Sequence, residues 1–583
     1  MANVANNKPS LLARMFSRMD TATPLLILVT IALLILIVLP LIALFREAFT
    51  DLDGNFTLSN FSAALSDSRN RQAIWNTIGL SFVVAMLGLL IGALLAFGLT
   101  RTKMPFKTML NAVVIISIIS PGFLIAFAYV LLLGPNSGLF NEALRVIFGL
   151  QTQTGPLNVY SAAGFVLLSV PLGIGITILQ LTPALQSIDS SVEEASRISG
   201  AGPIATLFGV TFRLISPALL SGFILTFTLT LATYGTPQVL GINVLSIAIR
   251  QSLLIVDDMK EASVLSVIAT VIAVLAVVMY RSAITAQKRY ETVGQRGARS
   301  NLFDIGRWRY LLGGLVILYG LLACVVPYGA LIYASVLRAI SHGPAWNNLT
   351  LEHYRGLIAD DFTRNALVNS LILSVTSAIG VIILGVLAGY ILIRTSSRAR
   401  ALLDYIAILP LGLAGTAFGI AVLVTYLNPP FQFLGLPGTL TIIWLAYVAH
   451  YVSFGVRGVQ TALMQISTEL TEAARMCGSS RLQTLWDVDV PLMTGAIIST
   501  SLLIIVLCFP ELSMSIMLRS VDTQVVATAL LGRWEGQGGL QSAAAMAVCM
   551  FALIAIALGV IYGALARRSK AARKSTKANA LGV

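Results

Sequence analysis

Long apolar runs alternate with short polar segments along nearly the whole chain. The run at residues 21–45, for example, holds 25 residues without a charged side chain. A helix that crosses the hydrocarbon core of a membrane needs about 20 consecutive apolar residues. Because backbone polar groups in lipid must be paired within their own segment, we expect each such run to be an α-helix. The twelve predicted spans are residues 24–45, 76–100, 108–134, 160–182, 216–234, 262–280, 310–337, 367–393, 401–427, 439–456, 494–516 and 540–566.

The composition agrees with an all-α membrane protein. Of the 583 residues, 57% are hydrophobic and 11% are charged, whereas about 25% of the residues in a soluble domain are charged. The first apolar run is too long for the core of a cleavable signal, so we expect it to remain as the first span. The net charge of +13 is explained by basic loops that orient membrane helices, and we expect no nucleic-acid partner.

The basic residues predict the orientation of the helices. If the N-terminus is cytoplasmic, the inner segments hold 27 of the 38 Lys and Arg residues, and the outer segments hold 11. An excess of Lys and Arg marks the cytoplasmic loops of membrane proteins, so we expect both termini on the cytoplasmic side. The tail that begins at Arg567 is predicted to be a solvated end that touches anionic lipid, rather than a site for a specific partner.

The chain also repeats itself. Residues 55–61 run parallel to residues 348–354, at an offset of 293. Two halves with six spans each have the same orientation, so they are predicted to be parallel repeats related by an axis along the membrane normal. Further pairs at the same offset are Asp67 with Asp360, Asn76 with Asn369, and Ser81 with Ser374.

The repeat and the charge distribution together predict the organisation of the chain. The predicted parts are a cytoplasmic N-terminal tail (1–20), a first six-helix domain (21–280), a basic cytoplasmic linker (281–309), a second six-helix domain (310–566) and a basic cytoplasmic tail (567–583).

Each half carries a long polar loop between its fourth and fifth spans. The two loops, residues 183–216 and 457–493, correspond at an offset of 278. Each combines a short helical stretch, a glycine, and large apolar residues four, seven and eight positions later, which fall on one helical face. That face either packs on the protein's own membrane helices or docks into a groove of a cytosolic partner, and the pattern favours neither. The residues are Ile204, Leu207 and Phe208 after Gly200, and Leu482, Leu485 and Trp486 after Gly478.

The second loop resembles the EAA loop of ABC importer permeases. Glu472, Ala473 and Ala474 are followed by three residues and then by Gly478. Nine residues later comes a Val-Asp-Val-Pro ending that closes with Pro491. All the elements of the family's motif are therefore present in this loop.

The first loop resembles the same motif with two departures. Glu194, Ala195 and Gly200 match, but Ser196 replaces the second alanine and the closing proline is missing. Pro217, four residues further on, is a candidate substitute in the turn. The missing proline concerns the geometry at the end of the loop.

The resemblance implies two tandem six-helix importer permease domains in one chain. Residues 194–208 and 472–486 would be coupling helices that seat in clefts of a separate ATPase subunit, with one copy for each loop. The glutamate of each loop would orient the loop, and the glycine would permit a left-handed turn or a close approach. A binding protein, periplasmic or lipid-anchored, would deliver the solute to a bacterial inner membrane.

The chain itself is not expected to be an enzyme. It has no GxxxxGK[ST] phosphate-binding loop, so the ATPase partner would bind ATP and magnesium, and this chain would bind no cofactor. Its four cysteines form no CxxC pair and its three histidines are scattered, so we expect neither a disulfide nor a metal site.

Two outer segments resemble those of fused ferric-iron-type permeases. They are residues 234–241 and 509–518, each at the outer end of the fifth span of its half. The subfamily also includes branches for 2-aminoethylphosphonate and borders polyamine and thiamine importers. The resemblance therefore implies ferric iron as the cargo, with these other small solutes as alternatives.

Four residues in these segments are candidates for the cargo path. Glu511 is one, because an ionisable group at membrane depth is costly and is often functional. The alternative for Glu511 is a place at the water interface, where it caps a helix or pairs with Arg519. Tyr234, Gly235 and Pro237 are predicted to shape a broken helix near the gate, and their alternative is an ordinary helix end.

Two other classes of protein compete with an ATP-driven importer. A secondary transporter driven by a proton or sodium gradient can also have six plus six helices. The patterned loops and the scarcity of charged residues within the spans disfavour it. A membrane-embedded enzyme is disfavoured because the sequence shows no spaced cluster of His, Asp and Glu.

Overall fold

The computed structural model describes residues 22–150, 152, 154–188, 192, 195–196, 198–287, 305–339, 346–395, 400–537 and 539–580. Within these ranges the chain is helical, and the only β-type pairings are two isolated bridges, Thr50 with Phe56 and Leu337 with Leu349. The predicted N-terminal tail (1–20) and residues 288–304 of the predicted linker lie outside the described residues.

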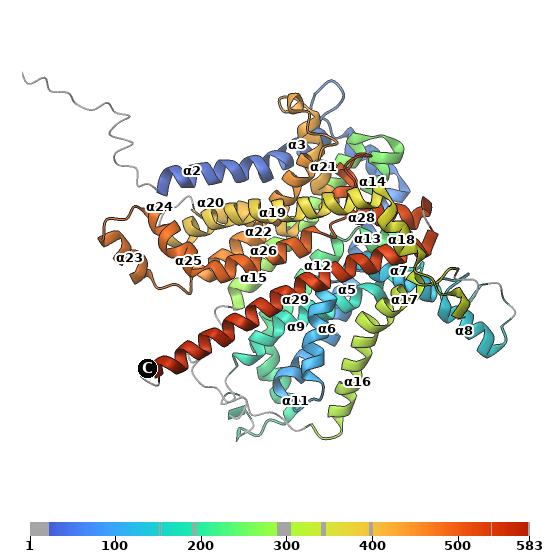
Figure 1. Cartoon of the computed structure of the whole chain (residues 1–583), viewed down its shortest axis with the longest axis horizontal. Coiled ribbons are helices and arrows are strands. Elements are labelled where there is room, and N and C mark those ends of the chain that lie inside the picture. The colour runs from blue at the N-terminus through green and yellow to red at the C-terminus, as the bar shows by residue number, and fades with distance from the viewer. Residues whose placement is uncertain are drawn as a thin grey trace, which may run out of the picture.

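The helices of the first half follow the predicted spans, with short helices between them (Figure 1). They are α2 (Ala22–Leu33), η1 (Leu34–Val38), α3 (Leu39–Ala48), α4 (Ser59–Ser66), α5 (Ser68–Arg101), α6 (Lys107–Ile119), α7 (Gly122–Leu133), α8 (Leu139–Phe148), α9 (Ala162–Gln186), α11 (Pro203–Thr206), η2 (Leu207–Thr211), α12 (Phe212–Leu231), α13 (Gly235–Leu240), α14 (Leu245–Gln251), η3 (Ser252–Val256) and α15 (Met259–Gln287).

The second half repeats this order. Its helices are α16 (Trp308–Gly320), η4 (Leu321–Val325), α17 (Val326–Ser335), η6 (Trp346–Asn348), α18 (Glu352–Ala359), α19 (Asp361–Arg394), α20 (Arg400–Ile408), η7 (Leu409–Gly412), α21 (Gly415–Leu427), η8 (Gln432–Leu434), α22 (Leu440–Leu463), α23 (Thr468–Met476), α24 (Arg481–Thr484), η9 (Leu485–Asp489), α25 (Val490–Leu492), α26 (Thr494–Cys508), α27 (Ser515–Leu518), α28 (Val526–Gly532), η10 (Arg533–Gln537) and α29 (Gly539–Ala580).

Two of the predicted spans are bent rather than straight, and a third bend lies just before another span. Among the described residues, nine helices are long and apolar enough to cross a membrane, and the number reaches twelve if each bent pair counts as one span. The predicted spans 108–134 and 401–427 break between α6 and α7 by 101° and between α20 and α21 by 116°. Pro121 opens the first break, and Pro410 precedes the second. Proline lacks a backbone N–H and clashes with the preceding turn, so it favours such breaks.

The third bent pair lies at the end of the second polar loop. The helical segment over residues 481–492 meets α26 at 76°, and α26 ends at Cys508. The predicted span 494–516 is therefore too long, because residues 509–514 leave the helix around Pro510.

Each half is packed around an equivalent pair of helices. In the first half, a Cβ atom added to Gly88 would lie 2.9 Å from the Cα atom of Gly173. In the second half, a Cβ atom added to Gly385 would lie 2.7 Å from the carbonyl carbon of Gly455. Glycines that let backbones approach closely are typical of helix contacts in membranes. The pairs α5 with α9 and α19 with α22 are thus the tightly packed centres of the two repeats.

The halves also exchange their first spans. Helices α2 and α3 pack against α19 and α21 of the second half, while α17 packs against α7 of the first half. The largest cluster of buried apolar residues accordingly runs through both halves. The repeats therefore share one core.

Candidate coupling loops and the cavity between the halves

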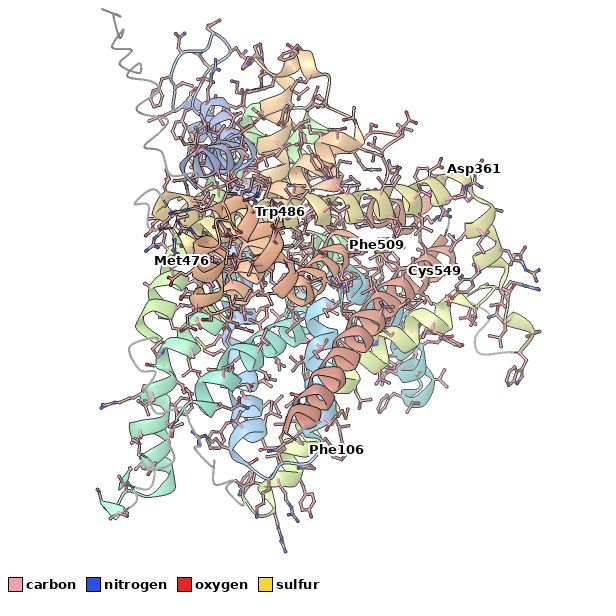
Figure 2. All side chains as sticks on the ribbon, turned by 60° about the vertical axis from the view of Figure 1, so that its left-hand side comes forward. Phe106, Asp361, Met476, Trp486, Phe509 and Cys549 are labelled. Atoms are coloured by element: carbon pink, nitrogen blue, oxygen red, sulfur yellow. The ribbon has the colours of Figure 1, made fainter. Side chains whose placement is uncertain are left out.

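The two polar loops lie on the same side of the helical bundle. In Figure 1, α23 lies at the left and α11 at the bottom, on the side where the C end of the chain is marked, while α8 and α18 lie at the right. Figure 2 likewise shows Met476 and Trp486 of the second loop far from Asp361, which begins α19. The loops are thus held at one end of the spans.

The second loop folds as a helix, a glycine turn and a second helix. The Ser467 side chain accepts a hydrogen bond from the Glu469 amide at the start of α23. Gly478 has a φ of +91°, a left-handed conformation that is open to glycine and costly for other residues. Ser480 and Gln483 then form a capping box at the start of α24. The Ser-x-x-Gln spacing was a signal for this cap that the sequence analysis missed.

The first loop has the same turn. Gly200 has a φ of +88°, and the Ala201 amide donates to the Ser196 carbonyl at 3.1 Å. At the equivalent place in the second loop, the Ser479 amide donates to the Ala474 carbonyl at 3.2 Å. The hydroxyl of Ser196 also lies 3.1 Å from that of Thr206. The serine that replaces the second alanine therefore joins the two arms of its loop.

Part of the first loop cannot be compared with the prediction. Ala195 is described, but Glu194 and the side chains of Ile204, Leu207 and Phe208 lie outside the described residues. The predicted apolar face of this loop remains an expectation.

The apolar face predicted for the second loop is partly buried and partly exposed. Leu485 is fully buried, whereas Leu482 and Trp486 are 49% and 50% exposed. Leu470 and Met476, of which Met476 is labelled in Figure 2, add further exposed apolar surface in the same loop. One side of the loop is therefore fixed to the bundle, and the exposed apolar residues Leu470, Met476, Leu482 and Trp486 are called the exposed apolar patch.

The Glu-Ala-Ala positions of the motif are mostly exposed in this loop. Glu472 and Ala473 face solvent on α23, and Ala474 is half-buried. Among the described residues, Glu472 has no hydrogen-bond or ion-pair partner. Pro491 is the second residue of α25 and lies near the end of the helical segment over residues 481–492.

An arginine anchors each loop to the end of a long helix. Arg101, the last residue of α5, donates to the carbonyls of Leu185 at 2.8 Å and Ile188 at 3.1 Å. Arg394, the last residue of α19, donates to the carbonyl of Ile466 at 3.3 Å. Arg101 and Arg394 are related by the offset of 293, and Ile188 and Ile466 by the offset of 278. The two anchors are therefore equivalent.

The second anchor contains an additional buried charge. Arg394 also contacts the Asp489 carboxylate at 3.2 Å, and both side chains are almost completely buried. The residue equivalent to Asp489 in the first half is Thr211. Sequence reasoning missed both arginines, although the Arg-Thr dipeptide at 101–102 and 394–395 continues the repeat.

The four candidates for the cargo path lie in short segments beyond the fifth spans. A break separates α12 from α13, and the buried Tyr234 stands at the start of α13. Its hydroxyl donates to Gln238 at 3.3 Å. A Cβ atom on Gly235 would lie 2.7 Å from Phe123, and Pro237 is buried within α13. The geometry is that of a broken helix packed closely against α7.

Glu511 caps a helix. Its carboxylate accepts hydrogen bonds from the Met514 amide at 3.1 Å and from the Ser515 amide and hydroxyl at 3.2 Å. The side chain is only 8% exposed. Arg519 donates instead to Gln524 at 2.6 Å. These contacts favour the capping interpretation, in which Glu511 fixes the start of α27.

A cavity of about 1060 Å³ opens between the two halves. Helices α9 and α12 supply most of the lining from the first half, and α22 and α26 supply most of it from the second. Leu470 of α23 and Leu492 of α25 also line it, so the cavity reaches the second polar loop. No group of three or more His, Cys, Asp or Glu residues in the described part of the chain is arranged to hold a metal ion.

Both halves of the chain match the same family of known proteins. Residues 88–289 and 381–571 each match the family described as "Binding-protein-dependent transport system inner membrane component". The ferric transport system permease protein FbpB of Actinobacillus pleuropneumoniae is 26% identical over 539 residues, which cover 90% of this chain and 77% of that protein. The putative ferric transport system permease protein FbpB 1 of Haemophilus influenzae is 26% identical over 508 residues, which cover 86% and 78%.

A further relative matches about half of the chain. The putative 2-aminoethylphosphonate transport system permease protein PhnU of Salmonella typhimurium is 28% identical over 264 residues. These residues cover 45% of this chain and 90% of that protein.

Proposed function

The chain belongs to the family of binding-protein-dependent transport system inner membrane components, and we propose that it forms the whole membrane pathway of an ATP-driven importer. The observation that carries this proposal is the double match to the family within one chain, which places one polar loop in each matched region. Two such halves in one chain replace a pair of separate permease subunits.

The partners follow from this mechanism. An ATPase subunit binds at each polar loop, with ATP and magnesium on the ATPase. A binding protein brings the solute to the opposite side. Closure of the ATPases, passed on by residues 194–208 and 472–486, switches the bundle between outward-open and inward-open states. Both termini and both loops are cytoplasmic, as the excess of basic residues on that side supports.

Ferric iron is the first candidate for the cargo. The two relatives that cover 90% and 86% of this chain are named as ferric transport permeases. The second candidate is 2-aminoethylphosphonate, because the PhnU relative matches over nine-tenths of its own length.

The cargo is tested by uptake in cells with and without this chain. Uptake of radiolabelled iron that depends on the chain supports the ferric candidate. Chain-dependent growth on 2-aminoethylphosphonate as the sole phosphorus source, without an effect on iron, selects the phosphonate. If neither depends on the chain, both candidates are wrong.

The exposed apolar patch provides a test of ATPase docking. We expect Leu482→Asp combined with Trp486→Asp to lower the amount of ATPase that copurifies with the chain at least tenfold. Both side chains are half-exposed, so the changes remove apolar contact from a partner rather than from the core. The measurement is the ATPase-to-permease ratio after affinity purification.

The matched control is Phe433→Asp combined with Leu434→Asp. These residues are also exposed and apolar, at 82% and 45%, but they lie between α21 and α22. The control should keep the normal ratio. Equal ratios for both double variants would contradict docking at the patch.

A further inference from the structure

The cavity between the halves has an uneven charge. Of the described residues that line it, none is acidic and one, Arg457 of α22, is cationic. The residue at the equivalent position of the first half is Leu179, which lines the same cavity and is 61% exposed. One wall is therefore basic, and the wall related to it by the internal repeat is apolar.

Neighbouring side chains hold Arg457 in place but occupy only some of its hydrogen-bond donors. Its Nη1 donates to the Gln460 side chain at 2.6 Å, and its Nη2 lies 3.0 Å from an oxygen of Asp404. The other oxygen of Asp404 accepts a hydrogen bond from Arg281 at 2.9 Å. A guanidinium group has five N–H donors, and the Arg457 side chain is 43% exposed. Several of its donors are therefore available to a molecule in the cavity.

Three of the hydroxyl groups that line the cavity are already engaged as donors. Ser453 donates to the Ala407 carbonyl, Thr461 to the Arg457 carbonyl, and Ser499 to carbonyls of its own helix. Such bonds leave each of these three hydroxyl oxygens as an acceptor only. Hydrogen bonds from an ionised donor are about twice as strong as those between neutral groups, so Arg457 is the strongest hydrogen-bond donor among the described residues that line the cavity.

We propose that the cargo crosses this cavity as an anion and that Arg457 is the residue that contacts it. This inference rests on the proposed importer function and specifies its substrate class. A guanidinium group binds a phosphonate or carboxylate through two parallel hydrogen bonds. A bare ferric ion would meet the Arg457 cation, and no described residue that lines the cavity carries a carboxylate. The cargo is therefore an oxyanion such as a phosphonate, or a metal ion inside a complex with net negative charge.

The first test measures uptake in cells that express the chain together with its importer partners. The probes are radiolabelled 2-aminoethylphosphonate and radiolabelled iron supplied as ferric citrate, which distinguish the two sources of negative charge. We expect Arg457→Gln to lower uptake of the transported probe at least tenfold and Arg457→Lys to keep more than a third. Adding Leu179→Arg to Arg457→Gln should restore part of the uptake, because it returns the charge from the opposite wall.

The matched control for these variants is Arg364→Gln. Arg364 is 61% exposed, pairs with Asp361 and lies in the first turn of α19, so this change should leave uptake unchanged. Normal uptake in Arg457→Gln would overturn the inference and leave the importer function intact. Increased iron uptake in Arg457→Glu would overturn it as well.

The second test does not depend on the cargo. A cysteine at Thr461, one helical turn from Arg457, is modified with methanethiosulfonate reagents that carry either a sulfonate or a trimethylammonium group. Cys477 and Cys549, the exposed native cysteines, are first changed to serine. We expect Arg457→Gln to lower the ratio of the anionic to the cationic rate at least fivefold. An unchanged ratio would overturn the inference, even if no probe were taken up and the cargo part of the proposed function had failed.

Discussion

Replacing Arg394 with alanine should abolish transport while leaving the chain inserted in the membrane. The change removes one member of a buried ion pair and leaves the Asp489 carboxylate in an apolar setting. Breaking such a pair by removing one partner costs about 3–5 kcal/mol. It also releases the Ile466 carbonyl, which lies in the second loop directly before α23. We therefore expect this loop to lose its fixed position, so that the membrane helices no longer follow ATPase closure.

The measurement compares solute uptake with ATP hydrolysis for each variant, relative to the amount of chain in the membrane. Arg394→Ala should lower uptake more than tenfold while hydrolysis continues. Arg394→Ala combined with Asp489→Ala should recover part of the uptake, because no buried carboxylate then remains without its partner.

Arg101→Ala is the matched variant in the first half. It removes the equivalent contacts to the Leu185 and Ile188 carbonyls, but the residue equivalent to Asp489 there is the neutral Thr211. We expect a smaller loss of uptake than for Arg394→Ala. Equal losses, or no loss in either variant, would contradict unequal anchoring of the two loops.

Proline at both Gly200 and Gly478 should uncouple the transporter completely. These glycines have φ values of +88° and +91°, whereas proline fixes φ near −65°. The turn between the two short helices of each loop cannot form with proline. We expect normal insertion but no copurifying ATPase and no uptake, measured by membrane blotting, affinity purification and transport.

Alanine variants show whether these positions need glycine for its left-handed conformation or for the space that a side chain would fill. A Cβ atom at Gly200, Gly478 or Gly202 meets no atom within 4 Å, and Gly202 lacks the left-handed φ. A left-handed conformation costs alanine about 1–2 kcal/mol. Gly478→Ala should therefore reduce coupling several-fold, and Gly202→Ala should be neutral. Full activity of the double proline variant would show that neither turn is needed for coupling.

The sequence was most informative where the physical signal is local. The number of spans follows from apolar length, which lipid imposes on any crossing helix. The glycine turns also follow from local pattern, because the left-handed conformation selects for glycine. The same reasoning could not find the bends of 101° and 116°, since hydropathy reports whether a segment is apolar and not whether it is straight.

The predicted apolar face of the second loop shows a second limit. Leu482, Leu485 and Trp486 fall on one face when the helix has 3.6 residues per turn. The pattern does not say what covers that face. Leu485 is buried, while Leu482 and Trp486 are about half exposed. The bundle therefore covers one of the three residues and leaves the other two at the surface.

The long-range contacts of the chain lay beyond the reach of the sequence. The exchange of first spans, the buried Arg394–Asp489 pair and the cation at Arg457 all depend on residues far apart in the chain. The internal repeat was the only signal that related such positions. It would have drawn attention to Arg101 and Arg394, which share an offset with pairs that were recognised.

The central claim, that this chain imports its solute by coupling to ATP hydrolysis, is tested most directly by the energy source of transport. The measurement is solute uptake into ATP-loaded, right-side-out membrane vesicles with the binding protein added outside. One sample receives orthovanadate in the lumen, and another receives a protonophore. We predict that vanadate stops uptake and that the protonophore leaves it unchanged. Uptake that survives vanadate and stops with the protonophore would contradict the account and identify an ion-coupled secondary transporter.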